Sequence, residues 1–169
     1  MFFPKIRKSG FTLIEVVVVM LVITLLMGVV APRFMERGKD AMNNRRGQDL
    51  SSVQRALEMY FADNGSYPTS TNWQGDAPNF GGLAYDQSGY IPGLVPQYID
   101  VLPRDPNSSY PETNRGYLYR SNGTDYKVLA FNTPTVFGND LSVNKYAKFF
   151  DPRRPNGSWM VSSPGALNW

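Results

Sequence analysis

Apolar residues are concentrated in one block near the N-terminus, and polar residues interrupt them regularly elsewhere. Phe11 to Ala31 is a run of 21 residues that holds one charged side chain, Glu15. As a helix this run is about 30 Å long, which matches the hydrocarbon core of a bilayer. The pattern predicts a transmembrane helix.

A second helical pattern continues beyond Pro32. Apolar residues recur there at steps of three and four: Met42, Leu50, Val53, Leu57, Tyr60 and Phe61. Such spacing is typical of an amphipathic helix with one apolar face, and Asn64-Gly65 is a usual stop signal. Pro32, Gly38 and Gly47 each weaken a helix. We therefore expect one long helix with a soft middle.

Alternation with a period of two appears in the second half of the chain. Gly116 to Arg120 and Asp125 to Phe131 alternate around Asn122-Gly123, a strong hairpin signal. Ser158 to Ser162 is a third strand candidate, and Lys145 to Phe150 is a weaker one. The fold class expected is α+β, with the long helix packed on a small antiparallel sheet.

Residues 66–115 separate the helix from these strands and are rich in Pro, Gly and Asn. One short helical turn is expected between Leu94 and Leu102. A connection of this length is more often functional than filler.

Charge is distributed unevenly. The net charge is +3, but three of the 17 basic residues (Lys5, Arg7 and Lys8) precede the apolar run, which leaves 14 basic against 14 acidic side chains. No basic stripe remains, so no nucleic-acid partner is predicted. We interpret Arg45-Arg46 and Arg153-Arg154 as solvated or lipid-facing pairs.

The chain contains no cysteine and no histidine. Disulfides, thiolate chemistry, Cys/His zinc sites and histidine-based triads are therefore excluded. Catalysis would need paired carboxylates or a Ser/Lys site, and no such arrangement is evident. The sequence predicts that the protein is not an enzyme.

Two ordinary explanations compete for the apolar run. A secretory signal peptide has a shorter core and a small-x-small cleavage site, whereas Gly28 to Ala31 is followed directly by Pro32. An uncleaved signal anchor explains the length of the run. It gives no reason for a carboxylate at Glu15.

Glu15 is costly in hydrocarbon, by about 2.5–3.5 kcal/mol, and calls for a cationic partner. The run contains no Lys or Arg. Cleavage between Gly10 and Phe11 would create an α-amino group four residues before Glu15, on the same helix face. That amine could pair with Glu15 of its own chain or of a neighbouring subunit, and the second pairing would set the register between subunits.

The segment Lys8-Ser9-Gly10-Phe11-Thr12-Leu13-Ile14-Glu15 resembles the prepilin signature of type IV pilins and type II secretion pseudopilins. The resemblance implies a pilin-like fold. It also implies that a prepilin peptidase cuts after Gly10 and methylates Phe11. Glu15 and Pro32 would then serve assembly, Pro32 near the membrane exit.

What the resemblance implies about function is a structural subunit of a type IV pilus-like or type II secretion filament. Its partners would be other pilin-like subunits, the prepilin peptidase, membrane lipid, and an inner-membrane platform with its ATPase. The subunit would lie in the inner membrane with a cytoplasmic N-terminus, then in a periplasmic or extracellular filament. The alternative is a membrane-anchored periplasmic binding module that does not polymerise.

This reading divides the chain into four parts: a leader (1–10), a transmembrane helix half (11–31), an amphipathic helix half (32–65) and a loop-rich β domain (66–169). Within the last part, Leu102-Pro103-Arg104-Asp105-Pro106 and Tyr117-Leu118-Tyr119 also resemble the pseudopilin pattern. Major pseudopilins usually continue with Trp-Gly where Asn107-Ser108 stands. A major and a minor subunit therefore both remain open.

Calcium is the one cofactor that the resemblance implies, because major pseudopilins bind it in a C-terminal loop. Oxygen ligands are offered by Asp125, Asn139, Asp140 and Asp151. Their spacing matches no dedicated calcium loop, which favours solvated loop acids. Asp125 and Asp140 remain the weak metal candidates, and no other cofactor is predicted.

Overall fold

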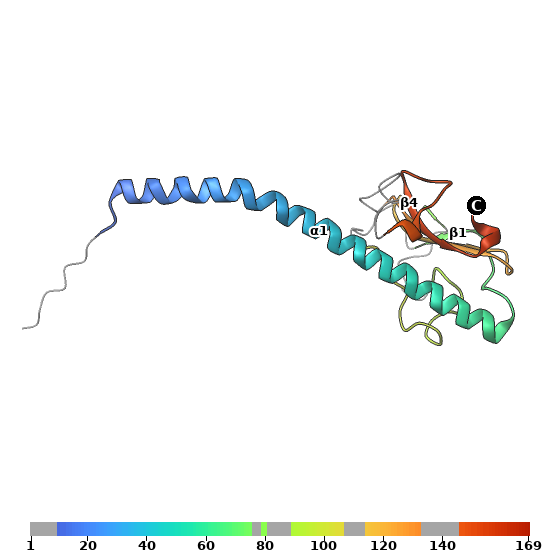
Figure 1. Ribbon diagram of the computed structural model, residues 1–169. Helices are drawn as coiled ribbons and strands as arrows, with labels where there is room; N and C mark the ends of the chain where they lie inside the picture. Colours follow the sequence, from blue (N-terminus) through green and yellow to red (C-terminus); the bar gives the residue numbers. More distant parts are fainter. Residues whose placement is uncertain (1–9, 76–78, 81–88, 107–113, 133–145) are drawn as a thin grey trace, which may run out of the picture. The chain divides into compact units, whose positions relative to one another are not determined.

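The computed structural model describes residues 10–75, 79–80, 89–106, 114–132 and 146–169, without the side chains of 29 and 31–36. The chain forms two compact units, Met1–Asp40 and Ala41–Trp169. The boundary lies inside the single α-helix of the described residues, α1 (Leu13–Asn64) (Figure 1). The predicted long helix is confirmed, and its predicted soft middle stays a prediction.

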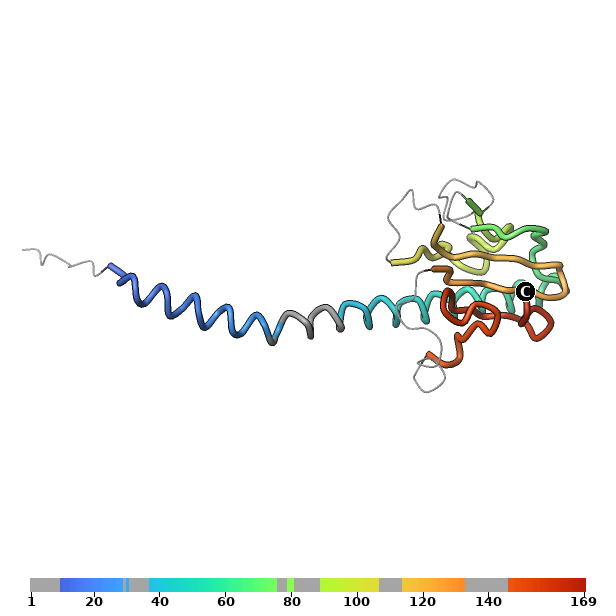
Figure 2. The backbone as a smooth tube through the Cα atoms, turned by 90° about the horizontal axis from the view of Figure 1, so that it is seen from above, coloured from blue at the N-terminus to red at the C-terminus, as the bar shows by residue number. Residues whose placement is uncertain are grey.

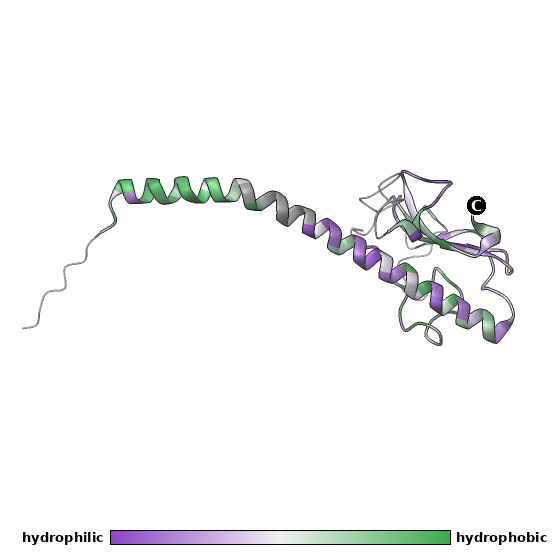
Figure 3. Cartoon of the chain, viewed as in Figure 1, coloured by the Kyte–Doolittle hydropathy of each residue, from purple (hydrophilic) through white to green (hydrophobic). Residues whose placement is uncertain are grey.

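The first unit presents its apolar side chains outward. Leu13 is 84% exposed and Val30 is 44% exposed, and the large apolar residues described between them are exposed as well. In Figure 3 the ribbon of this part of α1 is coloured almost throughout as hydrophobic, whereas hydrophilic and hydrophobic residues mix after Asp40. The described residues of this unit leave these side chains uncovered.

In the part of the chain that the structure describes, no helix is long and apolar enough to cross a membrane.

The second unit contains an antiparallel sheet of four strands in the order β1-β2-β3-β4. They are β1 (Ser70–Gly75), β2 (Gly116–Ser121), β3 (Tyr126–Phe131) and β4 (Ser158–Ser162). The hairpin predicted around Asn122-Gly123 is confirmed, with Tyr119 opposite Val128. The predicted third strand is confirmed as β4, which pairs with β3.

The second half of α1 packs on one face of this sheet. Leu50, Val53 and Leu57 are buried in one cluster with the inward residues of the strands: Tyr117, Tyr119, Tyr126, Val128, Ala130, Trp159 and Val161. The period of two in the strands meets the period of 3.6 in the helix, as the sequence pattern requires. The α+β architecture is therefore confirmed.

The opposite face of the sheet is also covered. Leu118, Leu129 and Met160 form a smaller buried cluster, with Trp73, Phe80 and Phe131 packed against it. The strands thus read as almost continuously buried, which is why neither face is cleanly polar.

Two elements differ from expectation. β1 was not predicted, because its sequence Ser-Thr-Asn-Trp-Gln-Gly is polar and its pairing with β2 is irregular between Ser70 and Gln74. The weak strand predicted at Lys145 to Phe150 is wrong, since η1 (Ala147–Phe149) is a 3₁₀ helix there. The ring of Phe149 stacks on Trp159 at 5.7 Å between centroids, and the next residue, Phe150, forms a single antiparallel bridge with Trp159 of β4.

The short helical turn predicted between Leu94 and Leu102 is present. The Tyr98 amide donates to the Leu94 carbonyl at 3.0 Å. In both views α1 runs between the segment 89–106 and the segment 146–157 (Figures 1 and 2).

Candidate assembly site and interaction surfaces

The N-terminus of α1 is closed by Thr12 and Glu15. The backbone N–H and the hydroxyl of Thr12 donate to Oε2 of Glu15 at 3.0 and 2.8 Å, and the Glu15 amide faces the Thr12 hydroxyl oxygen at 3.4 Å. This reciprocal arrangement is a capping box, which satisfies amides that the first helical turn leaves open. The Thr-x-x-Glu spacing that signals it was overlooked in the sequence.

Phe11 and Glu15 lie on one face of this helix. Together with Val16, Val19 and Met20 they line a hollow of about 280 Å³. The shared face that their spacing predicts is therefore present. The role of Phe11 after cleavage stays a prediction, and the side chain of Pro32 lies outside the described residues.

A buried ion pair joins α1 to the segment before β2. Nε and Nη2 of Arg46 donate to the two carboxylate oxygens of Asp105 at 2.6 and 3.0 Å, and both side chains are fully buried. Asn43 accepts from Nη1 of Arg46 at 2.8 Å. Our interpretation of Arg46 as solvated or lipid-facing is wrong, because its guanidinium reaches the Asp105 of the Leu-Pro-x-Asp-Pro segment.

Its neighbour Arg45 behaves as expected. The Arg45 side chain is 62% exposed and stands 3.9 Å from Asp49. The two adjacent arginines thus occupy opposite environments on one helix, and only tertiary contacts distinguish them.

Two acidic residues on α1 accept hydrogen bonds from the hydroxyl groups of buried tyrosines. The Tyr117 hydroxyl donates to Asp49 at 2.8 Å, and the hydroxyls of Tyr67 and Tyr126 donate to the two oxygens of Glu58 at 3.1 Å. Burial, and then the Glu58 carboxylate, raise the pKa of Tyr67 to about 12. Burial also raises the pKa of Asp49, against the opposing effect of the Tyr117 hydrogen bond.

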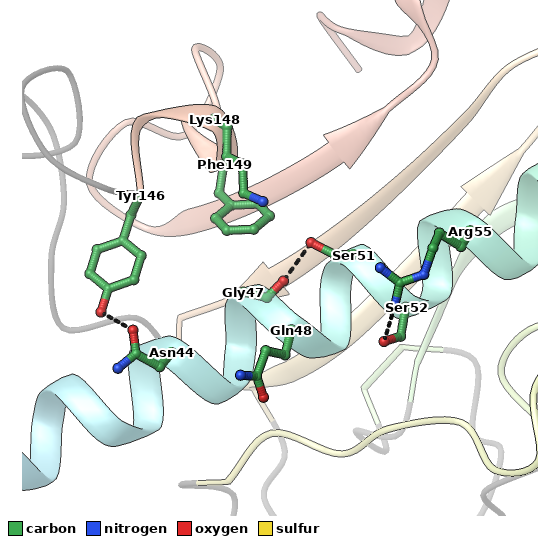
Figure 4. Close-up of a pocket in the computed structure, with 9 residues that line it drawn as sticks. All are labelled: Asn44, Gly47, Gln48, Ser51, Ser52, Arg55, Tyr146, Lys148 and Phe149. Atoms are coloured by element: carbon green, nitrogen blue, oxygen red, sulfur yellow. Dashed lines mark hydrogen bonds between the residues drawn. The ribbon is translucent and has the colours of Figure 1, made fainter.

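A polar groove of about 480 Å³ separates α1 from η1 (Figure 4). The hydroxyl of Tyr146 donates to Asn44 at 2.9 Å across one end. Arg55 and Lys148 border the groove, and none of its nine lining residues is acidic. The groove is therefore a basic surface on this side of the helix.

A second hollow, of about 320 Å³, lies where α1 meets the segment 89–106. Asp49 and Asp100 are among its six lining residues, and none of the six is basic. Val101 beside them is 47% exposed. Ser52 borders both hollows, so the basic and the acidic surface share one turn of α1.

A buried lysine holds the last residues of the chain. Nζ of Lys127 on β3 donates to Oδ1 of Asp151 at 3.0 Å and to the main-chain oxygens of Leu167 and Trp169 at 2.9 and 3.2 Å. Arg154 approaches the other Asp151 oxygen at 3.3 Å. Burial lowers the pKa of Lys127, and Asp151 opposes that shift.

Comparisons with known proteins identify the family of this chain. The family model described as "Prokaryotic N-terminal methylation motif" matches residues 5–31. A curated relative from Aeromonas hydrophila, "Type II secretion system core protein G", is 35% identical over 102 residues, which are 60% of this chain and 69% of that protein. The chain belongs to this core protein G family of pseudopilins.

Other members of the family match over shorter stretches. Core protein G of Escherichia coli K12 is 36% identical over 95 residues, 52% of this chain and 64% of its own. That of Pseudomonas aeruginosa is 38% identical over 64 residues, 38% of this chain and 45% of its own. No solved structure matches. The predicted pilin and pseudopilin family, and with it the filament-subunit class, is confirmed.

For a core protein G family member, the calcium expectation needs a test against the side chains present. Asp125 accepts from the Ser163 hydroxyl at 2.6 Å and from the Gly165 amide at 3.1 Å, which fixes the start of η2 (Pro164–Ala166). Asp151 already holds two cationic side chains. Among the described residues no three acidic side chains gather. Asn139 and Asp140 lie outside the described residues, so the calcium expectation stays a prediction.

Proposed function

We propose that this chain is a shaft-building subunit of a type II secretion pseudopilus. One observation carries the proposal. The large apolar side chains described from Leu13 to Val30 are exposed, whereas α1 beyond Leu50 buries its apolar face in its own domain. An apolar surface of that length needs a cover. Lipid supplies it before assembly, and the helices of neighbouring subunits supply it in the filament.

Processing would prepare the subunit for this change of surroundings. The prepilin peptidase cuts between Gly10 and Phe11 and methylates the new amine of Phe11. Until then, Phe11–Ala31 anchors the chain in the inner membrane with its N-terminus in the cytoplasm. After assembly the subunit lies in a periplasmic filament together with other pseudopilins. The membrane platform and its ATPase drive this assembly. We expect no catalytic activity.

Glu15 has two candidate roles, and the capping box separates them. One role is local, since its carboxylate caps the helix through Thr12. The other is electrostatic, since the amine of Phe11, once released, is a cation on the same helix face. A glutamine can fill the last position of a capping box but carries no charge.

The test compares three variants of the full chain in cells that carry the secretion machinery. Glu15→Gln keeps the cap and removes the charge, Thr12→Val removes the cap and keeps the charge, and Glu15→Val removes both. Mass spectrometry of the mature protein should find Phe11 first and methylated in all three. Filament yield should fall by about tenfold or more for both Glu15 variants, which is a loss of about 1.4 kcal/mol or more. It should stay near wild type for Thr12→Val.

Two results would contradict the proposal. A mature N-terminus other than Phe11 would remove the processing step. Normal filaments from Glu15→Gln together with poor filaments from Thr12→Val would leave Glu15 with a capping role alone.

A further inference from the structure

An open filament of identical subunits needs two different surfaces on every chain. A surface that pairs with itself closes into a dimer, whereas a head-to-tail contact repeats without end. The unit Ala41–Trp169 has two surfaces of this kind, on the two sides of α1 where the segments 146–157 and 89–106 lie (Figures 1 and 2).

The first surface is the groove between α1 and η1. Arg55 and Lys148 are exposed at its rim, and the ring of Phe149 lies beneath the Lys148 ammonium at 4.6 Å. Figure 4 shows both cationic groups free of any acidic neighbour among the residues that line the groove. The surface is basic at its edge, and the Phe149 ring at its base is buried, so it suits a carboxylate.

The second surface offers such a carboxylate. Asp100 is exposed, and Val101 next to it is one of the few large apolar residues left exposed in this unit. The turn before them is fixed, because the Ile99 amide donates to Leu94 at 3.3 Å and the fully buried Leu102 follows directly. Asp100 and Val101 thus place an acidic and an apolar side chain next to each other, both exposed where they border the second hollow, and we call this pair the projection.

We propose that the Asp100–Val101 projection of one copy enters the groove between α1 and η1 of the next copy. This rests on the proposed filament function and names its contact between globular domains. The Asp100 carboxylate lies beside Arg55 and Lys148 of the neighbour, and Val101 follows it into the groove. Each chain gives its projection to one neighbour and its groove to the other.

Charge decides the direction of this contact. Groove against groove places cations together, and projection against projection places carboxylates together, so both self-pairings are repelled. Only projection into groove brings opposite charges together. A closed pair, in which each copy fills the groove of the other, matches these charges too, because both surfaces include Ser52. Species larger than a dimer therefore distinguish the head-to-tail mode, in which the contact sets the register of each added subunit.

The chain lacks cysteine, so an introduced pair reports one designed contact without background. The experiment uses the full chain with Asp100→Cys and Lys148→Cys together, assembled in cells and oxidised mildly. Because each subunit then bonds to two neighbours, gel electrophoresis should show a ladder of dimers, trimers and larger species. Asp100→Cys alone should give no species beyond a dimer.

The matched control pair is Thr124→Cys with Lys148→Cys. Thr124 is exposed in the turn between β2 and β3, outside both surfaces. It should give no ladder. An equal ladder from this pair, no ladder from the first pair, or a crosslink to a different protein would each overturn the contact.

Charge reversal gives a second measurement that needs no oxidation. Asp100→Lys or Lys148→Glu alone should lower filament yield by about tenfold. The two together should recover much of it, since opposite charges face each other again. Filaments that form normally in all variants would refute the contact and leave the filament function intact. Absence of filaments from the wild-type chain would refute the function itself.

Discussion

Gly38 and Gly47 stand nine residues apart in one helix and have opposite surroundings. A Cβ atom added at Gly38 would meet nothing within 4 Å, whereas at Gly47 it would come within 2.8 Å of the Phe149 ring. The apolar residues show the same division, since Val22 is exposed and Leu57 is fully buried. The first half of α1 leaves its apolar side chains exposed, and the second half buries them against the sheet of its own domain.

Residue type alone therefore does not tell which half of α1 a residue serves. A glycine has open space beside it at Gly38 and admits an aromatic ring at Gly47. An arginine lies in solvent at one position and is fully buried at the next. Substitutions matched for type but placed in different surroundings therefore measure how much tertiary contact contributes.

The largest effect is expected from the two adjacent arginines. Arg46→Ala strips the buried Asp105 of its guanidinium and should lower the free energy of unfolding by about 3–5 kcal/mol. Arg45→Ala removes only an exposed pair with Asp49, worth about 0.5 kcal/mol or less. Denaturant unfolding of the full chain in detergent, followed by tryptophan fluorescence, measures both. Equal losses would refute the buried clamp.

A loss nearly as large is expected at Lys127. Lys127→Met leaves the buried Asp151 with the Arg153 amide and the partly exposed Arg154, and should cost about 3 kcal/mol. Lys148→Met, on the surface, should cost almost nothing.

Chelation by EDTA and addition of calcium should leave the melting temperature of the wild-type chain unchanged. A fall of several degrees in EDTA would show that a bound metal also holds the fold.

The glycine pair should move stability in opposite directions by smaller amounts. Gly38→Ala should raise the free energy of unfolding by about 0.5–1 kcal/mol, because alanine favours the helix and has room. Gly47→Ala should lower it by about 1–3 kcal/mol, because Phe149 must shift away from Trp159. Thermal unfolding of the two variants decides. Stabilisation by both would mean that the ring moves aside at little cost.

The smallest effect is expected from alkaline pH. The pKa of Tyr67 is about 12 in the folded chain and near 10 when unfolded, so the folded state keeps a proton that the unfolded state loses. Its contribution is complete below pH 10 and is lost as pH rises toward 12. The denaturant midpoint should fall between pH 9 and pH 11, and less so in Tyr67→Phe. An unchanged slope in that variant would assign the effect to other tyrosines.

The sequence was sufficient for the long helix, the hairpin and β4, because each has a clear period and a clear stop. Tyr117 and Tyr119 alternate with Leu118, and Asn122-Gly123 fits only a tight turn. The Phe11–Glu15 face followed from helical spacing. These features depend on residues close together in the chain, which is where pattern carries information.

The contacts that escaped prediction join residues far apart. Arg46 reaches Asp105 across 59 positions, and Lys127 reaches the oxygens of residues 40 or more positions away. A buried charge looks like a solvated one until its partner is located. β1 was missed for a related reason, since only its pairing with β2 marks those polar residues as a strand. The capping box was within reach, because Thr12 and Glu15 show its spacing.

The ammonium group of Lys127 ties β3 to residues 167–169 in the way a bound cation could. Stabilisation by a bound metal depends on the concentration of that metal around the protein and fades when the supply falls. An ammonium group carried on β3 is delivered with every copy of the chain, at a fixed effective concentration. The tie between β3 and residues 167–169 therefore depends on no ligand supplied by the medium.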